Sequence, residues 1–181
     1  MPNNRYFHLY AVLGLFCLTL VAVRLDYLTI LIVYMMIVPM FDRAWRDISE
    51  GHTIYRYAYH ARLVCAISIV LLIGPDFNMW LFAISTICLA ALPEEFFFRR
   101  YLQSKLGNSY VSILSVSAIF SILHMITVSW VMGLLVFIPS IIYGYIFKKT
   151  GDLILIILVH GLSNVVYKLY ISESINSYVS F

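Results

Sequence analysis

Charged residues are scarce in this sequence. Lysine, arginine, aspartate and glutamate make up 12% of its 181 residues, whereas 62% of the residues are hydrophobic and the mean hydropathy is +0.91. A typical domain that folds in water carries about 25% charged residues. The composition therefore excludes an ordinary water-soluble domain and indicates an integral membrane protein.

Cysteine is also scarce, with three residues and no CxxC pair. Cys17, Cys65 and Cys88 lie within apolar runs, so we expect inert, small hydrophobic side chains rather than a disulfide framework. The sequence has no internal repeat, no low-complexity tract and no basic patch typical of nucleic-acid binding. We therefore expect one integral-membrane domain over residues 1–181 that lies in the lipid bilayer and does not bind nucleic acid.

Seven apolar segments have about the length that a helix needs to cross the hydrocarbon core. They cover residues 7–23, 27–41, 63–74, 79–98, 110–126, 130–147 and 153–171. The second and third are short, so a count of six or eight stays open. The first has no small-residue cleavage pattern and a second apolar run follows it directly, so we expect an uncleaved helix. The predicted fold is an all-α, polytopic bundle of transmembrane helices.

The basic residues are distributed unevenly between the two sides of such a bundle. With seven crossings, ten of the twelve fall on the side of the N-terminus, and Arg24 and Lys168 remain on the other. The positive-inside rule then predicts a cytoplasmic N-terminus. The segment 42–62 mixes arginines with aromatic residues, and we interpret it as a belt at the membrane surface. The compact length favours the plasma membrane of a prokaryote.

Six polar residues lie deep inside the predicted helices rather than at their ends. They are Glu94, Glu95 and Arg99 in the fourth segment, His124 in the fifth, and His160 and Asn164 in the seventh. An ionisable side chain near mid-bilayer costs about 2.5–3.5 kcal/mol on insertion scales and by default marks a functional site facing the protein interior. At about 1.5 Å per residue, four of them lie at overlapping depths and are able to meet: Glu94, His124, His160 and Asn164.

Helical phase separates the two adjacent acids. Glu95 and Arg99 are four residues apart, so they face the same way and can neutralise each other. Glu94 is rotated away by about 100° and has no counter-ion on its own helix. A carboxylate in a dry place beside a like charge is suited to act as a general base. His160 and Asn164 are also four apart and present an imidazole and an amide on one face.

Several interpretations of these residues compete. A water between Glu94 and His124, with His160 and Asn164 donating to an oxyanion, would be a hydrolytic site. The glutamate and the two histidines are also the His₂Glu ligand set of a catalytic zinc, although the sequence has no HExxH. A proton or ion relay in a small transporter, or a non-catalytic immunity or scaffold protein, are alternatives of another class. Each histidine alone is more often a packed side chain bonded to a backbone carbonyl, and the asparagine an interhelical contact.

The order and spacing of these residues resemble a known family. "EEFFFR" at 94–99 fits EExxxR, "FSILH" at 120–124 fits FxxxH, and "HGLSN" at 160–164 fits HxxxN. In this order on successive membrane helices, the motifs resemble the CPBP family of intramembrane proteases, which includes the CAAX prenyl endopeptidases and the bacterial Abi proteins. The resemblance covers about residues 79–170. Each motif alone is weak, whereas the ordered triplet is specific.

The resemblance implies an intramembrane endopeptidase of the glutamic type. Carried over residue by residue, it assigns the activation of water to Glu94 and His124, and the stabilisation of the oxyanion to His160 and Asn164. The ion pair of the EExxxR motif has a supporting role, and no cofactor is implied, with zinc kept as the alternative. The expected substrate is a peptide or protein at the membrane: a CAAX-type end, a bacteriocin or peptide precursor, or a C-terminal sorting tag.

Overall fold

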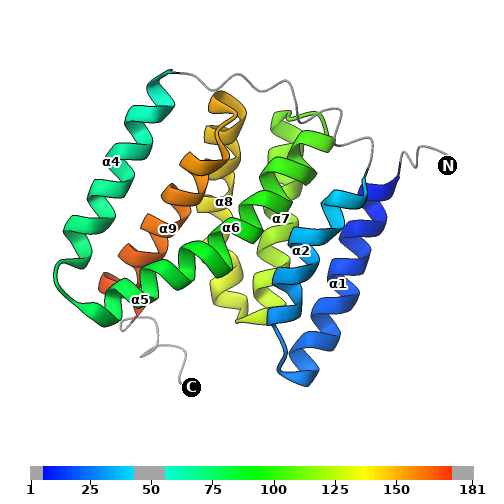
Figure 1. Cartoon of the computed structure of the whole chain (residues 1–181). Helices are drawn as coiled ribbons and strands as arrows, with labels where there is room; N and C mark the ends of the chain where they lie inside the picture. The colour runs from blue at the N-terminus through cyan, green and yellow to red at the C-terminus, as the bar shows by residue number, and fades with distance from the viewer. Residues whose placement is uncertain (1–5, 43–55, 173–181) are drawn as a thin grey trace.

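The computed structural model describes residues 6–42 and 56–172, and these residues form seven continuous helices (Figure 1). Three helices come first: α1 (Phe7–Leu25), α2 (Thr29–Phe41) and α4 (Arg56–Ile73). One long helix follows, composed of α5 (Phe77–Ser85), η1 (Thr86–Ala91), α6 (Leu92–Glu95) and η2 (Phe96–Gln103). The last three are α7 (Tyr110–Thr127), α8 (Trp130–Thr150) and α9 (Leu153–Tyr170). The predicted all-α bundle is confirmed.

Five of these helices are long and apolar enough to cross a membrane. They are α1, the long helix Phe77–Gln103, α7, α8 and α9. Two further apolar helices in the described part of the chain, Thr29–Phe41 and Tyr57–Ile73, are shorter. Large apolar side chains are exposed on the outer surface of the bundle, as at Leu71 and Val111, which suits contact with lipid rather than water. The chain is that of a multi-pass membrane protein.

Two helix boundaries differ from those predicted by hydropathy. Helix α4 begins at Arg56 rather than at residue 63, so the end of the predicted surface segment 42–62 is helical. Residues 43–55 of that segment lie outside the described residues. The long helix continues past residue 98 through two arginines to Gln103. Hydropathy marks the residues that tolerate lipid, whereas a helix continues into polar sequence wherever its backbone hydrogen bonds continue.

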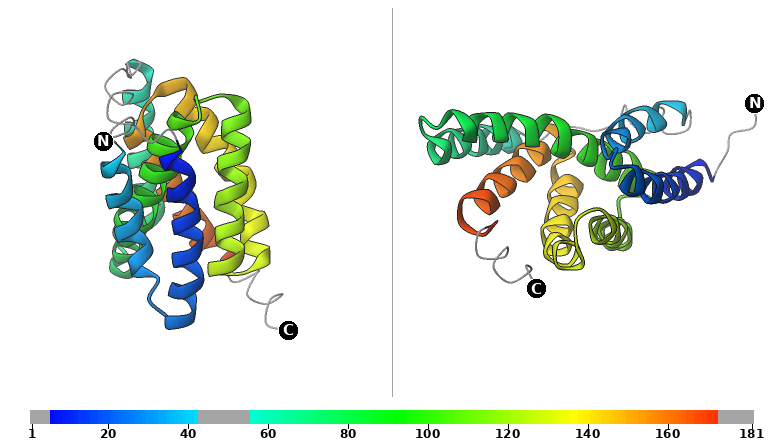
Figure 2. Two further views of the ribbon diagram at one scale, coloured as in Figure 1. Left: turned by 90° about the vertical axis from the view of Figure 1, so that its right-hand side faces the viewer. Right: turned by 90° about the horizontal axis from the view of Figure 1, so that it is seen from below.

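The long helix crosses the molecule diagonally and organises the others (Figure 1). Helices α7, α8 and α9 lie on one side of it, as the view from below in Figure 2 shows. Helices α7 and α8 pack against each other, α4 packs on α9, and α1 pairs with α2. The α1–α2 pair contacts α7 and η2, so three groups of helices meet near the middle of the long helix.

Capping residues define the short turns between the last helices. Gly151 ends α8 in the left-handed conformation, with a φ of 64°, which favours glycine. The next residue, Asp152, caps α9 by accepting a hydrogen bond from the backbone N–H of Leu155 at 3.0 Å. Ser109 and Ser129 cap α7 and α8 in the same way. Turns this short make consecutive helices antiparallel.

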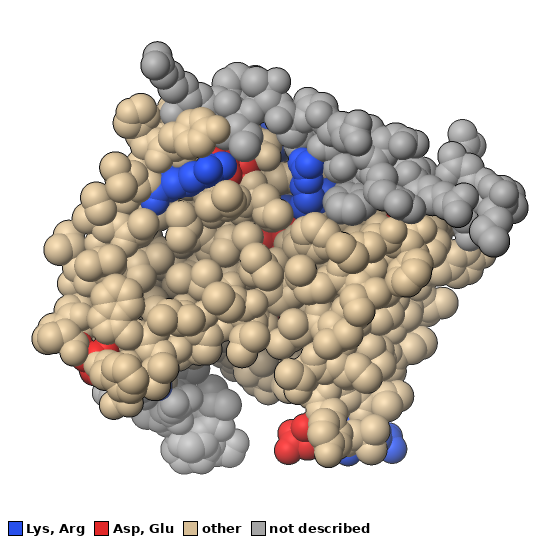
Figure 3. Space-filling model, viewed as in Figure 1, with Lys and Arg blue, Asp and Glu red and all other residues tan. Residues whose placement is uncertain are grey.

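Ion pairs join the helices at one end of the bundle, which we call the basic end. It is the upper end in Figure 1, where α2 and α8 finish and α9 begins, and Figure 3 shows lysine and arginine side chains on it. Arg62 of α4 binds both carboxylate oxygens of Asp152 at 2.6 Å. Lys105 binds Asp42 at 3.1 Å. The opposite end, called the far end, carries the α1–α2 and α7–α8 turns.

Removal of the bond between α4 and α9 is expected to destabilise the bundle. Asp152→Ala removes both the partner of Arg62 and the cap of α9, and the aspartate side chain is fully buried. We expect a loss of about 2–3 kcal/mol for this variant and about 1 kcal/mol for Arg62→Gln, because that arginine is partly exposed. Thermal unfolding of the purified protein in detergent measures both. Arg24→Gln, at an exposed arginine of the far end, is the matched control; an unchanged Tm for Asp152→Ala would contradict the role of this bond.

Candidate functional site

The two adjacent acids lie on a short α-helical stretch between two π-helical ones. Glu94 and Glu95 belong to α6, which follows η1 and precedes η2. Pro93 has no N–H to donate, and its ring excludes the carbonyl group four residues earlier. The wider π turn is compatible with this, and the N–H of Leu92 bonds to the carbonyl of Ile87, five residues back. The rise of about 1.5 Å per residue, used to estimate depth from the sequence, belongs to an α-helix and does not hold across these π turns. Such π segments occur frequently at functional sites.

Glu95 lies at the centre of a buried ionic cluster. Arg99 Nε donates to Glu95 Oε2 at 3.2 Å, the pair expected from the i, i+4 spacing. Arg99 also donates to Ser140 Oγ on α8. His160 Nδ1 of α9 lies 2.8 Å from the other oxygen, Glu95 Oε1. The side chains of Glu95 and Arg99 are 1% and 0% exposed, and buried charges of this kind are stable only with such partners.

His160 connects the two acids. Its Nδ1 is bound to Glu95, and its Nε2 lies 3.8 Å from Glu94 Oε2. The ring of Tyr143 stacks on the imidazole with centroids 5.1 Å apart, and Phe120 contacts it edge-on at 6.3 Å. These contacts hold the ring orientation, so Nε2 faces Glu94. The sequence predicted His160 to share a face with Asn164 and to lie near Glu94 and His124, and it did not predict the bond to Glu95.

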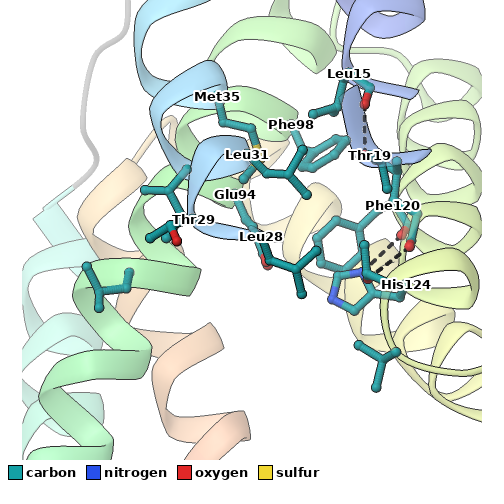
Figure 4. Close-up of a pocket in the computed structure, with 15 residues that line it drawn as sticks. Leu15, Thr19, Leu28, Thr29, Leu31, Met35, Glu94, Phe98, Phe120 and His124 are labelled. Atoms are coloured by element: carbon teal, nitrogen blue, oxygen red, sulfur yellow. Dashed lines mark hydrogen bonds between the residues drawn. The ribbon is translucent and has the colours of Figure 1, made fainter. Parts of the chain in front are cut away.

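His124 is held by its own helix. Its Nδ1 lies 3.0 Å from the backbone carbonyl oxygen of Phe120, and the two rings are 4.3 Å apart between centroids. Because a carbonyl oxygen only accepts, Nδ1 carries the proton and Nε2 is left as the acceptor of the neutral ring. Figure 4 shows His124 and Glu94 on opposite walls of one cavity.

Asn164 is positioned by contacts between α9 and η1. Its Nδ2 donates to Thr86 Oγ1 at 2.8 Å. The two helices approach closely because Gly161 has no side chain: a Cβ there would lie 2.6 Å from Ile87 Cγ1. One N–H of the amide is thereby occupied, and a second N–H remains. The asparagine also lines a cavity.

Two cavities meet at Glu94 and His124. The α1-side cavity, of about 280 Å³, lies among α1, α2 and α7 (Figure 4). The α9-side cavity, of about 540 Å³, lies among α7, α8 and α9. Glu94, Phe120 and His124 line both, whereas His160 and Asn164 line the second. The structure therefore brings Glu94, His124, His160 and Asn164 to one cavity. His124 also bonds to a backbone carbonyl oxygen and Asn164 also joins two helices, as the simpler interpretations of these residues expected.

Four residues of the site were not predicted from the sequence. They are Thr86, Phe120, Ser140 and Tyr143. Phe120 is the first residue of the FxxxH motif, four before His124, so its spacing was a signal that it shares a face with the histidine. Ser140 and Tyr143 lie on α8, which carries none of the motifs, and no local pattern distinguishes them.

The zinc alternative finds no support in the geometry. Across residues 6–42 and 56–172, no group of three His, Cys, Asp or Glu side chains is placed to hold a metal ion. In the candidate set of Glu94, His124 and His160, His160 Nε2 lies 3.8 Å from Glu94 Oε2 and its Nδ1 is bound to Glu95. A carboxylate on the second nitrogen is common for a metal-bound histidine, but no third ligand completes a site among the described residues.

One comparison with known proteins shows the family of the chain. Residues 76–166, from the start of the long helix into α9, match the family described as type II CAAX prenyl endopeptidase Rce1-like. No curated protein and no solved structure matches the chain. The matched segment covers half of the 181 residues and contains all three motifs. The chain therefore belongs to the Rce1-like family of type II CAAX prenyl endopeptidases, whose membership suggests an intramembrane protease with a protein substrate.

Proposed function

We propose that this protein is an intramembrane endopeptidase that uses water activated at Glu94 to cleave a peptide or protein at the membrane. The observation that supports this is the convergence of Glu94, His124, His160 and Asn164 on one cavity of about 540 Å³ inside a bundle of apolar helices. Residues 1–181 act as one membrane domain, and residues 79–170 carry the chemistry. The N-terminus is cytoplasmic in this proposal, and the membrane is the plasma membrane of a prokaryote.

Glu94 is the general base in this mechanism. Its side chain is 17% exposed and faces both cavities, so it reaches bound water without being open to bulk solvent. The unprotonated Nε2 of His124 accepts a hydrogen bond from the same water and orients it. Glu94 takes one proton, the remaining hydroxide attacks the scissile carbonyl carbon, and the carboxylic acid then returns the proton to the leaving amine.

His160 and Asn164 stabilise the tetrahedral intermediate. The amide of Asn164 donates one N–H to Thr86 and has the second for the oxyanion. His160 donates from Nε2 as an imidazolium, whose positive charge the nearby carboxylates of Glu94 and Glu95 balance. Donors held in place before the reaction lose little free energy to reorganisation, which is the main advantage of such a site. The ion pair of Glu95 with Arg99 therefore acts as support.

The two cavities fit a peptide that extends on both sides of the cleaved bond. They meet at Glu94 and His124, so the carbonyl group under attack lies at their junction and one substrate segment lies in each. The candidate substrates are a CAAX-type end, a bacteriocin or other peptide precursor, and a C-terminal sorting tag.

Glu94→Gln is expected to abolish cleavage while the folded protein stays in the membrane. The amide has nearly the size of the carboxylate and cannot accept a proton. Quantitative proteomics of membrane fractions from cells with the parent or the variant should reveal a precursor that accumulates uncleaved only with the variant. Lys168→Gln, at an exposed position of α9, is the control and should process the precursor normally. Full processing by Glu94→Gln would refute the assignment.

Loss of an oxyanion donor is expected to leave a trace of activity. Asn164→Ala should lower kcat by about 10²–10³, measured on a synthetic peptide that spans the identified cleavage site. Thr86→Val should lower kcat with little change in KM, because it removes the hydroxyl group that orients the amide, and Thr86→Ser should restore most of the rate. In the double variant Thr86→Val with Asn164→Ala, the two losses should not add. Additive losses would show that Thr86 does not act through Asn164.

A further inference from the structure

Both cavities occupy the half of the bundle next to the far end. Helix α7 contributes only its last turns, from Phe120 onward, and α8 contributes residues no later than Tyr143. Helix α9 contributes residues from His160 to its end. The first turns of α7 and α9 and the last turns of α8, which lie at the basic end in Figure 1, line neither cavity. The site is therefore the inner limit of two spaces that extend toward the far end.

Toward the basic end, buried side chains seal the site. The cluster of Glu95 with Arg99 forms the first layer. Beyond it, Gln103 is fully buried and donates to the carbonyl oxygen of Gly144 at 2.9 Å and to Asn108 at 2.6 Å. Lys148 then binds the backbone carbonyl oxygen of Asn108 at 2.8 Å. These contacts join the long helix to α8, and neither of the two cavities extends past them.

Toward the far end, the cavity walls are open. Leu28 is 41% exposed and Val128 63% exposed at the α1-side cavity. Leu135 is 45% exposed and Ile171 41% exposed at the α9-side cavity. Among the described residues that line the two cavities, the charged or titratable ones are Glu94, the two histidines and two tyrosines. The other lining side chains are uncharged. The openings therefore suit an uncharged peptide segment.

The distribution of basic residues indicates which face of the membrane each end occupies. The basic end carries Arg62, Arg100, Lys105, Lys148 and Lys149, on or next to helix ends. The far end carries Arg24 and Lys168. Lysine and arginine close to helix ends are concentrated on the cytoplasmic side of membrane proteins. The far end, with both openings, therefore faces away from the cytoplasm.

We propose that the site is entered from the non-cytoplasmic face, so that its substrate is an exported peptide segment, uncharged around the cleaved bond. That the entering peptide is cleaved rests on the proposed protease function, whereas the side of entry rests on the cavities and the charges alone. The sealed basic end keeps cytoplasmic peptides from Glu94. The enzyme thus processes peptides, or the outer ends of membrane proteins, after they have crossed the membrane.

Cysteine accessibility tests the side of entry in the full-length protein. Cys17, Cys65 and Cys88 are first replaced by serine, and single cysteines are then introduced as Leu135→Cys and Thr29→Cys, one for each cavity. Lys149→Cys, at an exposed position of the basic end, is the matched control. Bacterial spheroplasts are treated with a membrane-impermeant thiosulfonate, and cysteines still free are then counted with a permeant maleimide. The same treatment is applied to inside-out vesicles.

In spheroplasts, we expect the impermeant reagent to block both cavity cysteines, so that the maleimide no longer labels them. In inside-out vesicles, we expect it to block the cysteine of Lys149→Cys instead. Blocking of the cavity cysteines from the same face as Lys149→Cys would overturn the proposal. Blocking of the cavity cysteines only in inside-out vesicles would overturn it too, and so would no reaction of either from either face. The labelling needs no cleavage, so a protein that is not a protease can still bear out the side of entry, and the two failures are distinguishable.

Discussion

The buried carboxylate of Glu95 is the group on which the rest of the structure depends. It is bound by Arg99 from its own helix and by His160 from α9, and Arg99 extends the cluster to Ser140 on α8. Charges in an apolar bundle are strongly destabilising without partners, so only a packing that brings these three helices together is stable. The same bond turns the imidazole so that its second nitrogen faces Glu94. One adjacent acid thus holds the site together, and the other faces the cavities.

Irregular backbone and close helix contact complete the geometry of the site. The π-helical stretches on either side of α6 change the direction in which side chains leave the long helix, since a π turn holds more residues than an α turn. Gly161 lets α9 approach η1 so closely that Asn164 reaches Thr86. Phe120 packs against both imidazoles. Each of these contacts limits the rotation of a polar side chain that would otherwise sample several orientations.

The bundle is asymmetric along its axis, and this asymmetry has a functional consequence. Ion pairs and hydrogen bonds connect the helices at the basic end, whereas the far end is hollow on both sides of Glu94. Toward the far end, hydrogen bonds still join α7 to α8 and α9 to α8, as between Ser121 and the carbonyl oxygen of Gly133 and between Tyr167 and Met132, so the cavities lie beside helices that stay in contact. The ion pairs at the basic end thus lie in one half of the bundle and the cavities in the other, and the cluster of Glu95 with Arg99 and His160 lies between them.

The sequence by itself determined the membrane location, the all-helical fold, the approximate spans and the pairing of Glu95 with Arg99. Each follows from a local property, because hydropathy and the i, i+4 spacing involve residues within one helix. The ordered motifs also indicated the family. Only the tertiary structure decided that His160 binds Glu95, 65 residues away, and that Asn164 binds Thr86, 78 residues away. It also decided where the cavities lie and which residues of α8 complete the site, because these depend on how separate helices pack and rotate against one another, and no local pattern encodes that.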